Sequence, residues 1–232
     1  MTGPRVLIPA FDAAASIGRV LERVRLSAPS LPVLVVDDGS RDSTAEAARA
    51  AGVEVLSHPE NRGKGAALRT GFAAALDRGD SGVLTLDADG QHPPELLPRF
   101  LEASARADLV LGCRMDDAAS MPWLRLQANR LASRMVSARA GTRIRDSQCG
   151  YRWVSAGVLR RVDLRTERYE TESELLILAA RAGFRISESP VPAVYAGEAS
   201  GIRKMPDSVR LLRMLASLPR PRPRSRPASS GS

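Results

Sequence analysis

The stretch Val83–Pro94, VLTLDADGQHPP, decides how the rest of the chain is interpreted. Its apolar residues Val83–Leu86 predict a short buried strand that leads directly into Asp87. Asp87 and Asp89 are two positions apart, so in an extended segment both side chains project to the same side. Open α/β sheets bind ligands in the crevice beyond the carboxyl ends of their strands. We therefore expect both carboxylates to face that crevice.

The same stretch contains a candidate metal site. Gly90 permits a turn directly after Asp89, and Gln91 adds an amide oxygen. Mg2+ and Mn2+ prefer oxygen ligands of this kind and take further ligands from water and substrate phosphates. We therefore predict a Mg2+ or Mn2+ cofactor with Asp87, Asp89 and Gln91 as ligands. A surface turn without a ligand is the simpler interpretation of an isolated Asp-Ala-Asp-Gly sequence.

Strand and helix patterns alternate on both sides of this stretch. Apolar runs at 6–8, 33–36, 53–56 and 108–112 predict strands, and helices are expected at about 14–26, 43–51, 66–77 and 95–105. Such alternation predicts an α/β fold, with a mostly parallel central sheet flanked by helices. We expect one domain over residues 1–218, ending in an amphipathic helix at about 207–218. The Arg/Pro/Ser-rich segment 219–232 is expected to be disordered.

Composition narrows the possible classes of protein. The 232 residues are 44% hydrophobic, which is enough to bury one core. The sequence has no run of about 18 apolar residues, so we expect no membrane span. A strand pattern so close to the N-terminus is expected to leave no room for a signal peptide. Two cysteines do not form a disulfide framework. We expect a cytoplasmic protein, with peripheral attachment to the membrane as one option.

The net charge of +8 is concentrated in two segments. Residues 118–145 contain six arginines and no acidic residue, and residues 219–232 contain four arginines and no acidic residue. Basic segments attract nucleic acid, lipid headgroups or phosphorylated substrates. A solvated surface is the alternative for either segment.

Two further polar turns follow predicted strands. Asp37 and Asp38 directly follow the strand at 33–36, where acidic side chains can accept hydrogen bonds from a base or a ribose. Asp42 is as well suited to capping the next helix. The turn Asn61–Gly65 places Lys64 between two glycines that let backbone N–H groups approach an anion.

Taken together, these motifs resemble a known family. The segments IPAFD, VVDDGSRDST, NRGKGAALRTGF and LDADGQH, in this order, resemble family 2 glycosyltransferases of the GT-A (Rossmann-like) fold. The later segments DSQCGYR, RYETESELL, ESPVPAVY and SGIRKMPDSVRLLRML resemble the branch that makes polyprenyl-phosphate mannose or glucose. The resemblance covers about residues 5–216. One departure is Ala13, which replaces the glutamate of the usual PAYNE motif and removes one polar contact to the nucleotide.

The resemblance implies roles for individual residues. The nucleotide-sugar donor, of the GDP-mannose or UDP-glucose type, would be bound by Pro9, Ala10, Asp12, Asp37, Asp38, Lys64, Asp87 and Ala88. Asp89 would be the direct metal ligand, and Arg203 would close over the diphosphate. A lipid phosphate acceptor needs little or no general base, whereas a hydroxyl acceptor needs one, for which Glu172 and Glu174 are the candidates. Either glutamate is also suited to the first turn of a helix.

An acceptor site is predicted from the basic segment. The resemblance favours Arg114 as a ligand of an acceptor phosphate. Arg125, Asn129 and Ser133 recur every fourth residue, which places them on one face of a helix, and Leu124, Leu131 and Met135 lie near one another. Trp123 and the helix at 207–218 are suited to an anionic membrane surface. The resemblance implies a polyprenyl-phosphate acceptor, and these basic and membrane-facing features are compatible with it.

The favoured prediction is thus an inverting, metal-assisted hexosyltransferase that uses a polyprenyl phosphate, with no nucleic-acid partner. A soluble or protein acceptor is an alternative within the same class. A nucleotidyltransferase would need a GxGTR-type loop, which is absent. A non-catalytic basic module that binds anionic lipid or nucleic acid would not need the paired aspartates at 37–38 and 87–89.

Overall fold

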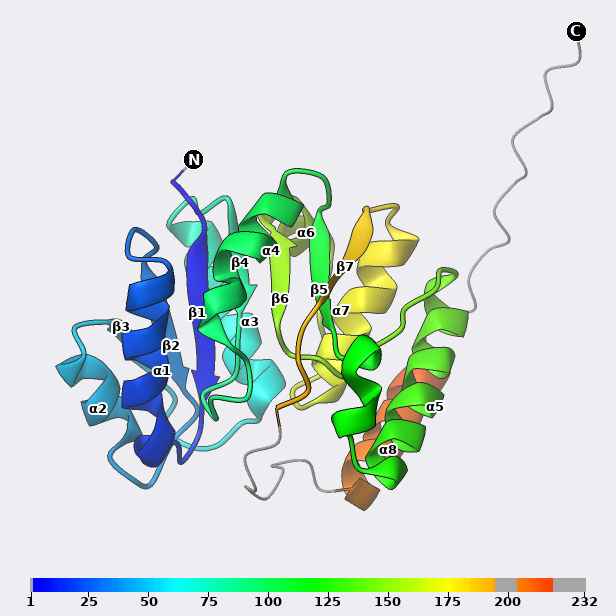
Figure 1. Cartoon of the computed structure of the whole chain (residues 1–232), viewed down its shortest axis with the longest axis horizontal. Helices are drawn as coiled ribbons and strands as arrows, with labels where there is room; N and C mark the ends of the chain where they lie inside the picture. The colour runs from blue at the N-terminus through cyan, green and yellow to red at the C-terminus, as the bar shows by residue number, and fades with distance from the viewer. Residues whose placement is uncertain (1, 195–203, 219–232) are drawn as a thin grey trace, which may run out of the picture.

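The structure is a computed structural model, and it describes residues 2–194 and 204–218. Its centre is a seven-stranded sheet in the order β3-β2-β1-β4-β6-β5-β7 (Figure 1). The strands are β1 (Arg5–Ala10), β2 (Val33–Asp37), β3 (Glu54–Ser57), β4 (Gly82–Thr85), β5 (Leu109–Cys113), β6 (Arg152–Ser155) and β7 (Ile186–Pro190). Only β6, among these strands, runs antiparallel to its neighbours β4 and β5. The prediction of a mostly parallel sheet in a single α/β domain is confirmed.

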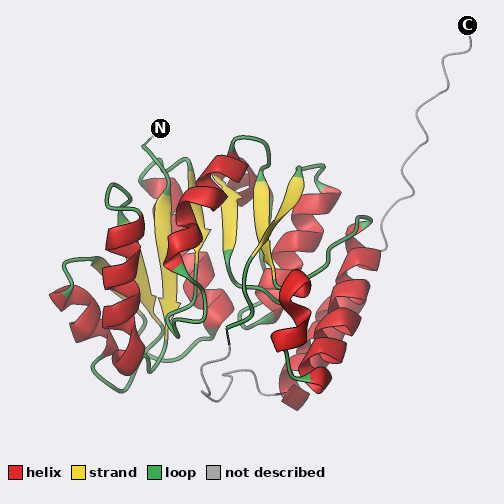
Figure 2. Cartoon of the chain, viewed as in Figure 1, coloured by secondary structure: helices red, strands yellow, loops and turns green. Residues whose placement is uncertain are grey.

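Helices cover both faces of this sheet (Figure 2). They are α1 (Ala14–Ser27), α2 (Thr44–Ala50), α3 (Lys64–Asp77), α4 (Leu97–Ser104), α5 (Trp123–Ala140), α6 (Ala156–Arg161), α7 (Glu170–Arg181) and α8 (Lys204–Ser217), with short 3-10 turns at Pro94–Leu96 and Met115–Ser120. In Figure 1, α1 and α4 lie on the near face and α3 and α7 on the far face. The strands β1 and β5 are buried from both sides, which explains why they contain almost no polar residues.

The edges of the elements differ in detail from the sequence predictions. The helix expected at 95–105 begins at Leu97, because Pro93 and Pro94 restrict the chain to a 3-10 turn first. The C-terminal helix begins at Lys204 rather than at about 207. The strands β6 and β7 and the helix α6 were not predicted. None of the helices in the described ranges is long and apolar enough to cross a membrane.

The sheet brings the polar turns together at one edge. The parallel strands β1, β2 and β4 are neighbours, with Ala10 paired to Asp37 and Leu7 paired to Thr85. The turns that follow these strands therefore lie side by side at their carboxyl ends. The opposite edge has a structural ion pair, in which Arg5 Nε donates to Asp80 Oδ2 at 2.5 Å, and both side chains are buried.

Candidate active site

A cleft of about 750 Å3 opens at the carboxyl ends of these strands. It lies between the turns after β1, β2 and β4 and the residues of α5, α7 and α8 that line its other side. Twelve of the residues predicted from the sequence line it: Pro9, Ala10, Asp12, Asp38, Lys64, Asp87, Ala88, Asp89, Gln91, Arg114, Arg125 and Glu172.

Lys64 is the centre of an ion-pair cluster on the floor of this cleft. Its Nζ atom lies 2.6 Å from Asp87 Oδ1 and 3.1 Å from Glu172 Oε2. Burial alone would lower the pKa of Lys64, but the charges of Asp87 and Glu172 outweigh it and hold this pKa above its usual value. Burial would likewise raise the pKa of Asp87, yet the charge of Lys64 lowers it to about 2. Lys64 and Asp87 are therefore both charged at neutral pH.

Three glycines allow this close packing. A Cβ atom at Gly65 would lie 1.9 Å from Thr171 Oγ1, and one at Gly150 would lie 2.9 Å from Lys64 Nζ. Gly63 has a φ of +103°, which L side chains rarely adopt. The N-terminus of α3 can therefore pack directly against the segment that begins α7.

The Asp-Ala-Asp-Gly turn has the oxygen atoms expected for a divalent metal. Asp89 Oδ1 accepts a hydrogen bond from the Gln91 N–H group at 2.9 Å, and the Asp87 N–H group donates to His92 Nδ1 at 3.1 Å. Burial and the nearby charge of Asp87 raise the pKa of Asp89. Within the described ranges no group of three or more His, Cys, Asp and Glu side chains is gathered as a metal site. Two carboxylates and an amide nevertheless fit Mg2+ or Mn2+, which take their remaining ligands from water and phosphate.

The two aspartates at the end of β2 have different surroundings. Asp38 lines the cleft, and its carboxylate accepts hydrogen bonds from the N–H groups of Arg62 at 3.0 Å and Gly63 at 2.7 Å. Its Oδ1 atom also lies 2.7 Å from His58 Nδ1. Asp37 lies outside the lining, is buried, and accepts a hydrogen bond from the Ser40 N–H group at 3.2 Å. Asp37 therefore shapes its own turn, whereas Asp38 fixes the turn that contains Lys64.

The turn after β1 is tied to the turn after β2. Asp12 has a φ of +47°, a conformation that Asp and Asn adopt more readily than other L residues. Its Oδ1 atom accepts a hydrogen bond from the Arg41 N–H group at 2.8 Å. Asp42 accepts from the N–H groups of Ala14 and Thr44, so it caps the starts of both α1 and α2.

Two of the predicted acceptor residues are not among those that line the cleft. Asn129 and Ser133 are buried, and Ser133 Oγ accepts a hydrogen bond from the Ser147 N–H group at 2.9 Å. Conversely, Leu124 and Leu131 on the other face of α5 are 72% and 60% exposed. Ser133 thus serves the segment before β6, and the acceptor role of Asn129 and Ser133 stays a prediction that the lining of the cleft does not support.

Glu174 is also turned away from the cleft. Its Oε2 atom accepts hydrogen bonds from the N–H groups of Arg165 and Thr166, both at 3.0 Å, and from Thr166 Oγ1 at 2.7 Å. Glu174 therefore holds residues 165–166 in place, and its role as a general base stays a prediction that these hydrogen bonds do not favour. Arg203 lies outside the described residues.

Arg114 lines the cleft and forms an ion pair with Asp146. Its guanidinium donates from Nε and Nη2 to the two carboxylate oxygens of Asp146, at 2.8 and 2.9 Å. A bidentate pair of this kind holds the side chain in one orientation. The charge of Arg114 is thus shared with Asp146 rather than directed at the cleft alone.

Several lining residues were not predicted as ligands. They include Ser147, Arg168, Tyr169, Asp207 and Arg210. Asp207 and Arg210 are three positions apart on α8, and Arg210 Nη1 lies 2.8 Å from Asp207 Oδ1. The polar residues of this amphipathic helix are visible in the sequence. From the sequence they are expected on a membrane-facing surface and not in the cleft.

The structure combines a mostly parallel sheet with a cleft at the carboxyl ends of its strands. Paired aspartates, a lysine between two glycines, and arginines line this cleft. This combination is typical of nucleotide-sugar transferases with the GT-A fold. Residues 5–166 match the family described as Glycosyl transferase family 2. The chain belongs to this family and is a glycosyltransferase.

Known proteins similar to this chain agree with that assignment. It is 36% identical over 199 residues to an undecaprenyl-phosphate mannosyltransferase of Micrococcus luteus, covering 81% of this chain and 82% of the other. It is 33% identical to a polyprenol monophosphomannose synthase of Mycolicibacterium smegmatis, covering 88% and 81%. A crystal structure of glucosyl-3-phosphoglycerate synthase from Mycobacterium tuberculosis with Mn2+ and UDP-glucose has the same fold, with a TM-score of 0.73 at 21% identity over 94% of this chain and 80% of that one.

Proposed function

We propose that this glycosyltransferase moves a hexose from a nucleotide-sugar to a polyprenyl phosphate, with inversion at the anomeric carbon. The observation that carries the proposal is the composition of the cleft. Its floor has the paired aspartates and Lys64, while Arg125 of α5 and Arg210 of α8 line its other side. The names of the relatives from Micrococcus luteus and Mycolicibacterium smegmatis support a polyprenyl-phosphate acceptor and a mannosyl donor.

The donor would be held by the turns after β1, β2 and β4. Asp38, which lines the cleft, would lie beside the nucleoside, and Asp87, Asp89 and Gln91 would hold Mg2+ or Mn2+. Such an ion, when bound, would neutralise charge that develops on the departing nucleoside diphosphate. Lys64 adds a fixed positive charge beside Asp87. Both effects stabilise the leaving group in the transition state.

The state of Glu172 favours a phosphate acceptor over a hydroxyl acceptor. Its Oε2 atom is 3.1 Å from Lys64 Nζ, and its Oε1 atom is 4.0 Å from Arg152 Nη2. If Glu172 took a proton from an acceptor hydroxyl, the ion pair with Lys64 would be lost at that moment. A phosphate monoester is already a competent nucleophile and requires no such proton transfer. Glu172 is therefore better suited to holding Lys64 than to general-base catalysis.

The acceptor would reach the cleft from a membrane surface. On α5, Trp123, Leu124 and Leu131 are 68%, 72% and 60% exposed. Arg130 and Arg134 are exposed on the same helix. Aromatic and leucine side chains flanked by arginines bind the interface of anionic bilayers. This face belongs to the helix that contributes Arg125 to the cleft, so docking here would bring the cleft near the lipid headgroups.

The donor assignment is tested first, because it needs no acceptor. Nucleoside diphosphates and nucleotide-sugars are screened by thermal shift with and without Mn2+, since ligands that bind the folded state raise Tm. We expect a Mn2+-dependent shift with one nucleotide, lost in Asp89→Ala and kept in Glu46→Ala, which removes a carboxylate from α2 instead. No shift with any nucleotide would overturn the donor assignment.

The acceptor is tested by transfer of radiolabelled hexose to a polyprenyl phosphate in anionic vesicles. We expect alkali-stable, acid-labile lipid product in the wild type and at least about a tenfold loss in Leu124→Asp/Leu131→Asp, which would weaken vesicle binding. Transfer to a short, water-soluble prenyl phosphate should be unaffected in this variant. Hexose transfer only to a soluble or protein hydroxyl would contradict the proposed acceptor.

A further inference from the structure

Arg152 has the surroundings of a residue that organises the site without lining it. It begins β6 and is 1% exposed, the largest fully buried side chain in the described ranges. A guanidinium at this depth is tolerated only when its charge and its N–H groups are all matched by partners. Its partners therefore show what it holds in place.

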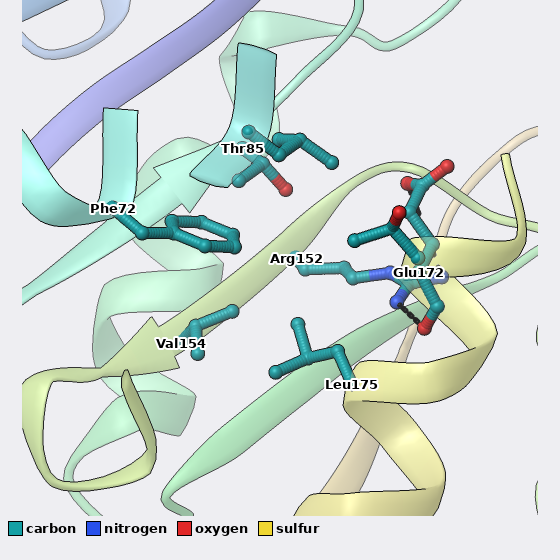
Figure 3. Close-up of a pocket in the computed structure, with 8 residues that line it drawn as sticks. Phe72, Thr85, Arg152, Val154, Glu172 and Leu175 are labelled. Atoms are coloured by element: carbon teal, nitrogen blue, oxygen red, sulfur yellow. Dashed lines mark hydrogen bonds and ion pairs between the residues drawn. The ribbon is translucent and has the colours of Figure 1, made fainter. Parts of the chain in front are cut away.

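Those partners are three backbone carbonyls from two separate segments. Nε donates to Cys149 O at 2.9 Å, and Nη2 donates to Ser147 O at 3.0 Å. Nη1 donates to Glu172 O at 2.5 Å, the contact drawn as a dashed line in Figure 3. The planar guanidinium thus joins the loop before β6 to the first turn of α7.

Both of these segments reach the cluster around Lys64. In the loop, Gly150 passes so close that an added Cβ would lie 2.9 Å from Lys64 Nζ. In α7, the carboxylate of Glu172 lies between Arg152 Nη2, at 4.0 Å, and Lys64 Nζ, at 3.1 Å. Lys64 in turn lies 2.6 Å from Asp87 Oδ1. A continuous line of alternating charges therefore runs from Arg152 through Glu172 and Lys64 to Asp87.

Arg152 itself does not reach the large cleft. It lines a separate cavity of about 10 Å3, together with apolar side chains that include Phe72, Val154 and Leu175 (Figure 3). A cavity of this size holds at most one water molecule. Any influence of Arg152 on a bound nucleotide must pass through the residues that it holds.

We infer that Arg152 is a positioning residue of the donor site, acting through Glu172 to hold Lys64 against Asp87. This inference rests on the proposed function, because its consequence is the affinity for the nucleotide donor. The loop carbonyls fix where the guanidinium sits, and the guanidinium fixes where α7 places Glu172. Residues that directly orient metal ligands are worth about 10–100-fold in affinity or activity, and we expect the low end of this range for Arg152, which acts through two further residues.

The conservative variant Arg152→Lys tests this role. Lysine keeps the positive charge, but its single nitrogen cannot reach the carbonyls of Ser147, Cys149 and Glu172 together. Binding of the nucleoside diphosphate that shifts the wild type is measured by calorimetry with Mn2+, well below the Tm of each variant. We expect affinity at least about tenfold weaker than in the wild type.

Arg5→Lys is the matched control. Arg5 is also a buried arginine, paired with the buried Asp80 at the opposite edge of the sheet. It should lower Tm to a similar extent and leave nucleotide affinity unchanged. If Arg152→Lys binds the nucleotide as tightly as the wild type does, or no more weakly than Arg5→Lys does, the inference is overturned.

A double variant tests the route through Glu172. Glu172→Gln should weaken nucleotide binding on its own, and Arg152→Lys/Glu172→Gln should be little worse than the weaker-binding single variant. Losses that multiply in the double variant would overturn the inference while leaving the donor site intact. A wild-type protein that binds no nucleotide would instead overturn the proposed function, and this inference with it.

Discussion

Replacing Lys64 with methionine tests whether the buried ammonium stabilises the floor of the cleft. Methionine has a similar length but no charge, so Asp87 and Glu172 would remain as two carboxylates with no cation between them. Removing one member of a buried ion pair costs about 3–5 kcal/mol. The side chain of Asp87 keeps 27% exposure, so water relieves part of this cost. We expect the free energy of unfolding at pH 7 to fall by about 3 kcal/mol.

The loss should shrink in acid. Lys64 and the other nearby cations lower the pKa of Asp87 to about 2 in the folded protein. A carboxyl group whose pKa is lower in the folded than in the unfolded chain stabilises the fold above its unfolded pKa, about 3.9, and this stabilisation is lost as the pH falls through the folded pKa. At about 1.4 kcal/mol for each pKa unit, this shift corresponds to a contribution of about 2–3 kcal/mol from Asp87 at pH 7. The difference between wild type and Lys64→Met should therefore be at least about 1 kcal/mol smaller at pH 3 than at pH 7.

The assay is urea unfolding at pH 7 and pH 3 in buffer with a chelator. Arg19→Met is the control, because it removes one exposed positive charge from α1. It should change the free energy of unfolding by less than about 0.5 kcal/mol at either pH. The reasoning is refuted if Lys64→Met is as stable as the wild type at pH 7, or if its loss is the same at both pH values.

Three further predictions follow from the site. Gly150→Ala should weaken Mn2+-dependent nucleotide binding about tenfold in calorimetry, because its Cβ would lie 2.9 Å from Lys64 Nζ and 3.0 Å from the carboxylate of Asp87. The control Gly18→Ala, whose Cβ would meet nothing within 4 Å, should bind the nucleotide as the wild type does. Equal affinities in the two variants would argue against this packing. Glu174→Ala should lower the free energy of unfolding by about 3 kcal/mol in urea, yet leave nucleotide affinity unchanged; a selective loss of affinity would return this residue to the site. Saturating nucleotide should raise the affinity of the protein for Mn2+, which is measured by electron paramagnetic resonance. The factor should equal the one by which Mn2+ raises the affinity for the nucleotide. Independent binding of the two would contradict a shared site.

Most of the fold could be predicted because its signals are local. Buried parallel strands appear as short apolar runs, and β1, β2 and β4 were located to within about two residues. The strand β6 was missed because it begins with Arg152, and a charged residue does not indicate a buried strand. Its burial depends on three carbonyls from other segments, which no local pattern shows.

The candidate site could be predicted where it follows directly from strand ends. Asp38, Asp87 and Asp89 line the cleft because the carboxyl ends of parallel neighbours meet at one edge. The pairing of Lys64 with Glu172 joins residues more than a hundred positions apart, and spacing along the chain does not fix such a contact. The glycines around Lys64 were visible in the sequence, but the segment they approach was not.

The orientation of α5 shows a different limit. Four-residue spacing correctly placed Asn129 and Ser133 on one helical face, but periodicity does not say which face is buried. Here the polar face is buried because neighbouring backbone groups need partners: Ser147 N–H donates to Ser133 Oγ, and Ile144 N–H donates to Ser137 Oγ at 2.9 Å. Burying an N–H group without a hydrogen-bond partner would lower the free energy of unfolding more than leaving Leu131 in contact with solvent does.

The charges on the cleft floor give a reason for metal and nucleotide to bind together. Three carboxylates, those of Asp87, Asp89 and Glu172, gather around Lys64 on this floor. The charge of Arg114 also acts on Asp87, but Arg114 is paired with Asp146. The raised pKa of Asp89, caused by burial and by the charge of Asp87, reflects this excess of negative charge. A nucleoside diphosphate would add negative charge to a floor that is already negative, and like charges at close range repel. A divalent cation held by these carboxylates would make the local charge positive. The carboxylates that repel the nucleotide alone would then favour its binding together with the metal.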